Sequence, residues 1–279
     1  MTTPRVFRDA TGAQIERLTR TLVGARLFPD AEALRAIHAD QPWRIQVSDR
    51  ADVAVLGRWR DHLPLLAIEA LWCPFRFVPD AITAVSRIAR EHGYTGVVSP
   101  PVSQDEAPAY AAGGMAAREW LITLDARADA DAVVSVSPGV TLRVASLADV
   151  PGLLELDAAC FDSFWRYDRR LLERFTTAGA ITVAERDERA VGYTLCTVDR
   201  EASVLGRLCV LPSERRRGVG RMLVSDAVGR SGRAGARHVT LSMQADNESA
   251  LALYASVGFR PTGRRYAFMT LDTGPEAAR

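Results

Sequence analysis

The sequence lacks an excess of charge of either sign, because 35 lysine and arginine residues stand against 34 aspartate and glutamate residues among 279. A balanced chain has no global field that attracts polyanions, so we expect neither nucleic acid nor a membrane as a partner. No apolar run approaches the roughly 20 residues that span a bilayer, since the longest, residues 63–75, is interrupted by Glu69 and Pro74. The N-terminus has no apolar signal core, and we expect a cytoplasmic protein.

Cysteine is scarce, and its spacing excludes the usual cysteine-based sites. The four cysteines are Cys73, Cys160, Cys196 and Cys209, and none belongs to a CxxC pair or a Cys/His cluster with metal-ligand spacing. In a cytoplasmic chain such isolated thiols are normally reduced and buried. We therefore expect neither a metal site nor a disulfide framework.

The chain is long enough for two domains of roughly 100–150 residues each. One segment resembles a linker: residues 127–138, with the sequence RADADAVVSVSP, are mostly small, polar or acidic. We predict a first domain over residues 1–126, a linker over 127–138 and a second domain over 139–279. The VVSV stretch within this segment also fits an edge strand.

Apolar periodicity predicts an α/β fold for the second half. The expected order is β-α-α-β-β-β-α-β-α-β, a mixed and mostly antiparallel sheet flanked by helices. The predicted strands cover residues 140–145, 181–186, 190–198, 203–211, 238–244 and 266–272, and the predicted helices cover residues 147–162, 169–178, 218–233 and 249–257.

The first half repeats the end of this pattern. A strand at 67–72, a helix at 79–91 and a strand at 94–99 precede Tyr110-Ala-Ala-Gly-Gly-Met115, which parallels Tyr254-Ala-Ser-Val-Gly-Phe259. A strand ending in Thr-Leu-Asp follows each of these segments. The repetition predicts a duplicated domain with diverged copies, although any α/β chain can produce such similarities by chance.

A basic, glycine-containing loop is the sharpest chemical signal. Residues 208–221 read LCVLPSERRRGVGR, so a strand leads into three arginines and then into two glycines that open a helix. Helix N-termini present unpaired N–H groups that bind phosphate, and glycine lets a phosphate approach the backbone. The alternative is a solvated arginine run beside a turn. No Gly-Lys-Ser/Thr follows, and the third glycine of a dinucleotide fingerprint is missing.

These residues resemble the GNAT superfamily of N-acetyltransferases. Arg215-Arg-Arg-Gly218-Val-Gly220 matches its Q/R-x-x-G-x-G/A motif, and residues 247–259 match its N-x-x-A-x-x-x-Y-x-x-x-G-F pattern at the expected distance. The resemblance implies a site for acetyl-CoA, with the cofactor arm along one strand, the pyrophosphate on loop N–H groups and Tyr254 as general acid to the departing thiolate. The implied cofactor contacts are Leu208, Cys209, Val210, Arg215, Arg216, Arg217, Gly218, Val219, Gly220, Arg221 and Asn247.

Each implied role has a structural alternative. Asn247 could simply cap its helix, Tyr254 could be a core residue, and Cys209 is expected to be a passive thiol facing the core. The general base is unassigned, because Ser242 stands where some relatives carry a glutamate. Asp162, Asp168 and Glu185 are other candidates, although isolated carboxylates are usually solvated.

The expected reaction is acetyl transfer from acetyl-CoA to a primary amine, either a small molecule or a protein N-terminus. Residues 160–168 are expected to form the acceptor mouth, with Trp165 as a substrate contact. In the first half, residues 73–80 match the phosphate loop but contain no glycine pair and end in Asp80. We therefore expect this half to bind no cofactor. Tandem family members such as mycothiol synthase are similar in this layout. The alternative is a regulatory module that binds acyl-CoA without turnover.

Overall fold

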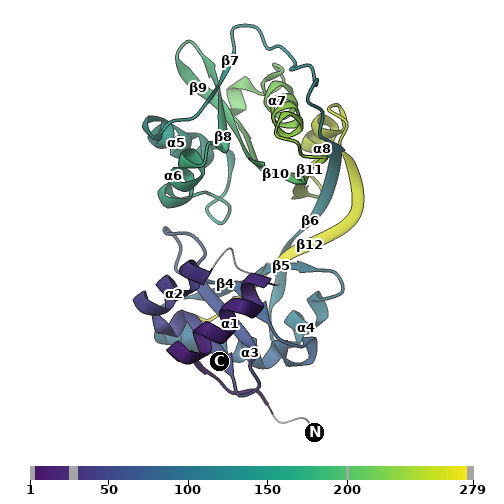
Figure 1. Cartoon of the computed structure of the whole chain (residues 1–279). Coiled ribbons are helices and arrows are strands. Elements are labelled where there is room, and N and C mark those ends of the chain that lie inside the picture. Colours follow the sequence, from purple (N-terminus) through teal and green to yellow (C-terminus); the bar gives the residue numbers. More distant parts are fainter. Residues whose placement is uncertain (1–3, 25–30, 199–200, 275–279) are drawn as a thin grey trace. The chain divides into compact units, whose positions relative to one another are not determined.

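The computed structural model describes residues 4–24, 31–198 and 201–274, and the chain divides into two compact units (Figure 1). The N-terminal unit comprises Met1–Trp120 and Tyr266–Arg279, and the C-terminal unit comprises Leu121–Arg265. Each unit has its own α/β architecture. The predicted fold class, two related α/β domains in tandem, is confirmed.

The N-terminal unit carries a mixed sheet in the order β1-β2-β3-β4-β5-β12, in which only the β4–β5 pair is parallel. Its strands are β1 (Phe7–Asp9), β2 (Ile45–Ser48), β3 (Val53–Arg58), β4 (Leu65–Trp72), β5 (Gly96–Ser103) and the end of β12 (Arg260–Asp272). Its helices are α1 (Gly12–Gly24), α2 (Ala31–Asp40), α3 (Val78–Glu91) and α4 (Ala107–Ala112), with short 3-10 turns at Pro42–Arg44 and Phe75–Phe77.

The C-terminal unit repeats this plan, with strand order β7-β8-β9-β10-β11-β6 and a parallel β10–β11 pair. Its strands are β7 (Thr141–Val144), β8 (Ile181–Arg186), β9 (Arg189–Val198), β10 (Ala202–Val210), β11 (His238–Gln244) and the end of β6 (Ala116–Arg127). Its helices are α5 (Val150–Cys160), α6 (Arg169–Thr177), α7 (Val219–Arg233) and α8 (Glu248–Ala255), with 3-10 turns at Leu147–Asp149 and Pro212–Glu214.

Helices cover both faces of the C-terminal sheet (Figure 1). Alternation along the strands divides the core, since Tyr193 and Leu195 pack with α5 and α6 while Cys196 and Leu205 pack on the α7 side. The element order β-α-α-β-β-β-α-β-α-β agrees with the prediction, and the bounds of β8 and β11 coincide with those expected from periodicity alone.

The compact units have different bounds from the predicted domains because the last strand of each sheet comes from a distant part of the sequence. Strand β6 begins in the N-terminal unit, but its residues 121–127 pair with β11 of the C-terminal unit. Strand β12 begins in the C-terminal unit, and its residues 266–272 pair with β5 of the N-terminal unit. These two strands carry the repeated Thr-Leu-Asp sequence. The duplicated pattern therefore lies on β6 and β12, the two strands that complete the sheet of the other unit.

The segment predicted as a linker, residues 127–138, is packed against α7 inside the C-terminal unit. A Cβ atom on Gly232 would collide with the backbone of Asp129 and Ala130, so the glycine permits this close approach. Ser137 is 1% exposed, and its hydroxyl donates to the carbonyl oxygen of Arg217 over 2.8 Å. Residues 128–138 form no strand, so the edge-strand alternative for VVSV is wrong.

Candidate functional site

Strands β10 and β11 diverge, which leaves a gap in the backbone pairing of the sheet. Their described parallel pairs run only from Ala202↔His238 to Val204↔Thr240. Beyond this point β10 stays paired with β9 as far as Val210, and β11 stays paired with β6 as far as Gln244. The edge of β10 that faces β11 therefore offers backbone groups to an extended ligand, over the stretch predicted to line the cofactor arm.

A β-bulge at Gly206 decides which side chains of β10 face each helix layer. The register with β9 shifts between Leu205 and Arg207. Because of this shift, Leu205 and Arg207 point to opposite faces of the sheet although they are two positions apart. Leu205 packs on the α7 side, whereas Arg207 and Cys209 point toward α5. Cys209 is 1% exposed, as expected for a thiol that faces the core.

The loop that follows β10 turns sharply into α7 through two left-handed residues. Arg216 has φ 65° and Gly218 has φ 87°, and Gly218 is the N-cap of α7. A left-handed conformation suits glycine and costs other residues free energy, so the arginine is held there by its surroundings. The N-cap has no side-chain hydrogen bond, and the first backbone bond of the helix runs from Met222 N–H to the Gly218 carbonyl over 3.0 Å.

Six consecutive N–H groups at this turn are free within the part of the chain that the structure describes. They belong to residues 216–221, none of which donates a backbone hydrogen bond to a described residue. Such consecutive N–H groups at a helix N-terminus form a concave site for phosphate oxygens. The residues expected to hold the pyrophosphate, Arg216 to Arg221, are therefore brought together.

The arginine side chains of the loop differ in their surroundings. Arg215 Nε donates to the Val210 carbonyl over 3.2 Å, which links the loop to the free edge of β10. Arg217 lies 3.6 Å from Glu214, which also pairs with Arg186 at 3.2 Å. Arg216 is exposed and has no ion-pair partner among the described residues, so its charge remains available to an anion.

Helix α8 packs against the start of α7 and positions Tyr254. A Cβ atom on Gly220 would lie 3.1 Å from Leu253 Cδ2, so the second glycine of the motif lets the two helices approach closely. Asn247 Oδ1 accepts from Ala250 N–H over 3.0 Å, which confirms the capping role expected for Asn247.

Tyr254 is 8% exposed, and its ring meets Phe259 edge to face with centroids 5.7 Å apart. No described residue makes a hydrogen bond with its hydroxyl. Burial disfavours the phenolate and raises the pKa of Tyr254 to about 12. The side chain is thus a protonated donor across the neutral range.

The carboxylates proposed as bases are engaged in local structure. Asp162 accepts from the N–H of Phe164 over 2.9 Å, and Asp168 caps α6 by accepting from Leu171 N–H over 2.9 Å. Glu185 is paired with Arg143. None of the three is an uncommitted base, and the exposed Ser242 on β11 lies beside Thr123.

A buried ion pair that the sequence did not reveal ties the predicted acceptor segment to β10. Arg207 and Asp157, 8% and 0% exposed, are joined by two hydrogen bonds of 2.9 and 2.8 Å. Tyr193 donates its hydroxyl to the same carboxylate, and the N–H of Tyr167 donates to it over 2.7 Å. The guanidinium stacks between the rings of Phe161 and Tyr167, at 3.7 and 3.9 Å.

The same guanidinium donates to the carbonyl of Trp165. Trp165 is half-buried, with its ring edge to face with Phe164 at 5.0 Å. The predicted substrate contact therefore lies in a segment whose backbone is fixed by Arg207. Phe161 packs against the α5–α6 core, and Phe164 is buried, so both side chains have a structural role.

Substitution of Asp157 by alanine is expected to lower the free energy of unfolding by about 3–5 kcal/mol. The change leaves the buried guanidinium of Arg207 and the Tyr193 hydroxyl without their carboxylate partner. Chemical denaturation monitored by circular dichroism measures the loss. The matched control is Glu173→Ala, which removes the exposed i,i+4 partner of Arg169 at 3.5 Å and should cost less than about 1 kcal/mol. Equal losses in the two variants would contradict a structural role for the buried pair.

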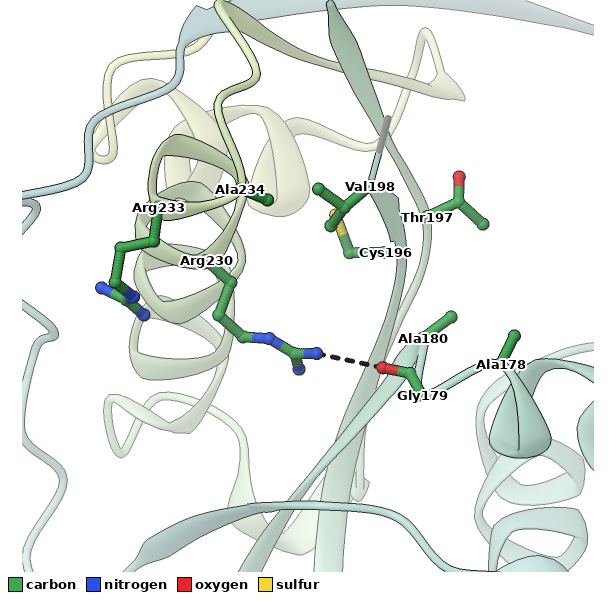
Figure 2. A pocket seen from close by; sticks show the side chains of 9 residues that line it. All are labelled: Ala178, Gly179, Ala180, Cys196, Thr197, Val198, Arg230, Arg233 and Ala234. Carbon is green, nitrogen blue, oxygen red and sulfur yellow. Dashed lines mark hydrogen bonds between the residues drawn. The ribbon is translucent and has the colours of Figure 1, made fainter. Parts of the chain in front are cut away.

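A hollow of about 510 Å³ lies at the far end of α7 from the basic loop (Figure 2). Its lining includes Arg230, Arg233 and Ala234 of α7, and Arg230 donates to the carbonyl of Gly179 over 3.0 Å. None of the predicted site residues lines it. It lies at the carbonyl end of α7, so the free N–H groups of the helix start do not face it.

Within residues 4–24, 31–198 and 201–274, no group of three or more His, Cys, Asp or Glu side chains is arranged to hold a metal ion. Across the same described residues, no helix combines the length and apolar character needed to cross a bilayer.

Comparisons with known proteins agree with this geometry. Residues 150–259 match the profile of the acetyltransferase (GNAT) family. A ribosomal protein bS18 alanine N-acetyltransferase of Salmonella typhimurium is 30% identical over 92 residues, which are 33% of this chain and 62% of that protein. The match therefore spans less than two thirds of the curated relative.

Solved structures resemble the chain over both units. A tandem GNAT protein from the clavulanic acid biosynthesis pathway aligns with TM-score 0.63 and 21% identity over 83% of this chain and 82% of its own. A GCN5-related N-acetyltransferase from Sphaerobacter thermophilus aligns with TM-score 0.66 and 18% identity over 98% of both chains. At these identities the likeness concerns the fold.

Proposed function

We propose that this chain, whose residues 150–259 match the acetyltransferase (GNAT) family, transfers the acetyl group of acetyl-CoA to a primary amine by direct attack of the amine on the thioester. The observation that carries this proposal is the row of six free N–H groups at residues 216–221, beside the unpaired edge of β10. The row of N–H groups matches the diphosphate of CoA, and the unpaired edge of β10 matches the extended amide arm of the same cofactor.

In this proposal the diphosphate accepts hydrogen bonds from the N–H groups of residues 216–221, and the exposed Arg216 and Arg217 add positive charge. Leu208, Cys209 and Val210 present backbone groups to the pantetheine arm, and Asn247 contacts it from the start of α8. The chemistry that acetyl-CoA supplies when bound is an activated acyl group. The protein supplies orientation and a water-poor site, which raise the effective concentration of the reacting groups.

Tyr254 is the proposed general acid. Its hydroxyl has no described partner, and burial keeps it protonated, with a pKa of about 12. A positioned acid of this kind can protonate the departing thiolate of CoA, a contribution typically worth 10²–10⁴-fold in rate. No residue is assigned as base, because the candidate carboxylates Asp162, Asp168 and Glu185 cap or pair locally. Water and backbone carbonyls remain as the route for the proton that the amine loses.

The acceptor is proposed to be a small-molecule amine or a protein N-terminus. The Salmonella typhimurium relative acts on an alanine of a ribosomal protein, which favours including N-terminal alanine peptides in any screen. We place the acceptor against residues 160–168, with Trp165 as the contacting side chain.

The N-terminal unit is proposed to bind no CoA. Its strands β4 and β5 also pair over only three positions, so the divergent strands are retained. The helix that connects them, α3, has no glycine pair at its start, and Asp80 lies in its first turn. Asp80 Oδ2 accepts from Arg5 N–H over 2.8 Å, and its negative charge opposes a phosphate. The proposal therefore predicts one cofactor per chain.

Two measurements test the proposal together. Calorimetric titration of the full chain with CoA should give a stoichiometry of one, and thiol release from acetyl-CoA should depend on an added amine. A competing function, an acyl-CoA-binding regulatory module, is favoured by the serine at position 242 and the absence of an assigned base. Binding without amine-dependent thiol release across a broad amine panel would select the module, and no binding would reject both.

The pH dependence of kcat/KM should show a rising limb that follows deprotonation of the acceptor, near pH 10.4 for alkylamines and near pH 8 for α-amines. A raised pKa means that Tyr254 keeps its proton to higher pH, so no falling limb is expected between about pH 9 and pH 11. Initial rates with an N-terminal peptide amine measure the profile. A fall centred near pH 10, where an ordinary tyrosine ionises, would contradict the raised pKa of Tyr254, and the same fall in Tyr254→Phe would show that another group is the acid.

A further inference from the structure

Two thiols meet beside the divergent strand β10, and the proposed acetyl transfer uses neither of them. Cys160 ends α5, and Cys209 lies on β10 with its side chain turned toward that helix. Their Sγ atoms are in direct contact at 2.7 Å, and a disulfide bond would bring them to about 2.05 Å. No sequence pattern indicates this pair, because the two residues are 49 positions apart and belong to different elements.

The surroundings of the pair favour reaction at one of the two sulfurs. Cys160 is half-buried, while Cys209 is 1% exposed, so a reagent in solution reaches Cys160 first. The S–H of Cys209 points at Cys160, and Arg215 of the basic loop lies nearby. These neighbours lower the pKa of Cys160 to about 7, the larger share coming from the Cys209 hydrogen bond. A thiolate at neutral pH is the reactive form of cysteine.

Cys209 has the properties of the second, resolving thiol. Its hydrogen bond to Cys160 and its burial hold its pKa well above the usual range. When Cys160 has been consumed, the hydrogen bond and the neighbouring negative charge disappear, and the pKa of Cys209 falls. The second sulfur thus becomes able to attack only after the first has reacted.

We propose that Cys160 and Cys209 form a reversible disulfide by exchange with a low-molecular-weight disulfide, which makes this pair a redox modification site. The Cys160 thiolate attacks one sulfur of the reagent and expels the first small thiol. Cys209 loses its proton to solvent and attacks the Cys160 sulfur, which expels the second small thiol. The protein pair loses two electrons and two protons, and the reagent disulfide is reduced to two thiols.

Three neighbouring groups respond to this bond, namely the Val210 and Leu156 carbonyls and the Arg215 side chain. While Cys160 carries its proton, its Sγ donates to the Val210 carbonyl over 3.4 Å, and Cys209 Sγ lies 3.3 Å from the Leu156 carbonyl. Oxidation removes both S–H donors. The Val210 carbonyl then accepts only from Arg215, as described above. Oxidation therefore changes the hydrogen bonding at the edge of β10 and at the basic loop.

The test is exposure of the full reduced chain to oxidised glutathione at pH 7.5, followed by alkylation of free thiols, tryptic digestion and mass spectrometry. The expected product has lost two hydrogens, retains two alkylated cysteines and yields one cross-linked pair of peptides, residues 144–166 with 208–215. Four alkylated cysteines, or glutathione retained on Cys160 without a cross-link, would overturn the proposal.

Variants and a denatured control keep the test specific. Cys160→Ser should abolish the cross-link and leave three alkylated cysteines, whereas Cys73→Ser should form the same cross-linked peptides as the parent chain. In concentrated guanidinium chloride the same treatment should lose its preference for this pair, because the fold is what brings the thiols together. A cross-link that is equally frequent in denaturant would show that the native geometry does not direct it.

Discussion

Replacement of Tyr254 by phenylalanine is expected to lower kcat for acetyl transfer by roughly 10²–10³-fold, with little change in the affinity for CoA. The substitution removes one hydroxyl that has no described hydrogen-bond partner and keeps the ring that packs on Phe259. Loss of stability should therefore be small, and the missing function is proton donation to the departing thiolate. Steady-state kinetics with acetyl-CoA and calorimetric titration with CoA separate the two effects.

Tyr110→Phe is the matched control for this variant. Tyr110 occupies the corresponding position before the glycine pair in the N-terminal unit and is also buried, at 6% exposure. The Tyr110→Phe variant should keep kcat within about twofold of the value for the parent chain, since the N-terminal unit is proposed to bind no cofactor. Undiminished turnover in Tyr254→Phe would remove this residue as the acid, while leaving the cofactor site intact.

The second large effect is expected at the start of α7. Gly218→Val should weaken CoA binding by roughly 100-fold or more, because valine is strongly disfavoured at φ 87° and the turn must rearrange. Losing two hydrogen bonds to a charged phosphate, at about 1.5–3 kcal/mol each, accounts for a change of this size. Calorimetric titration of the variant with CoA measures it.

Gly235→Val provides a control with the same backbone strain. Gly235 has φ 88°, and a Cβ atom there meets nothing within 4 Å. It lies just beyond the opposite end of α7, so its substitution should cost comparable stability without changing the Kd for CoA. Parallel weakening in both variants would mean that general destabilisation, and not the loop N–H groups, controls binding.

Much of this architecture was accessible from the sequence because it depends on local chemistry. Alternating apolar residues located β8 and β11, and the Arg-Arg-Gly-Val-Gly turn indicated the free N–H groups that the structure places at residues 216–221. Asn247 as a helix cap follows equally from its position before an apolar helical stretch.

The remaining features depend on which distant segments meet, and no local pattern encodes that. Residues 266–272 were predicted as a strand, but alternation specifies a buried face and does not specify that β5 is the partner. Asp157 and Arg207 each appear as an ordinary charged residue in its own element. Their pairing depends on the bulge at Gly206, which turns Arg207 toward α5.

The exchanged strands constrain the order in which the chain can fold during synthesis. Residues 266–272 complete the sheet whose other strands all lie before residue 104, so this sheet is unfinished until residues 266–272 have left the ribosome. Nascent domains otherwise tend to fold from the N-terminus onward. Here one edge of β5 stays unpaired until a strand more than 160 residues later has been synthesised. A chaperone or the ribosome surface would have its main opportunity to contact this edge during that interval.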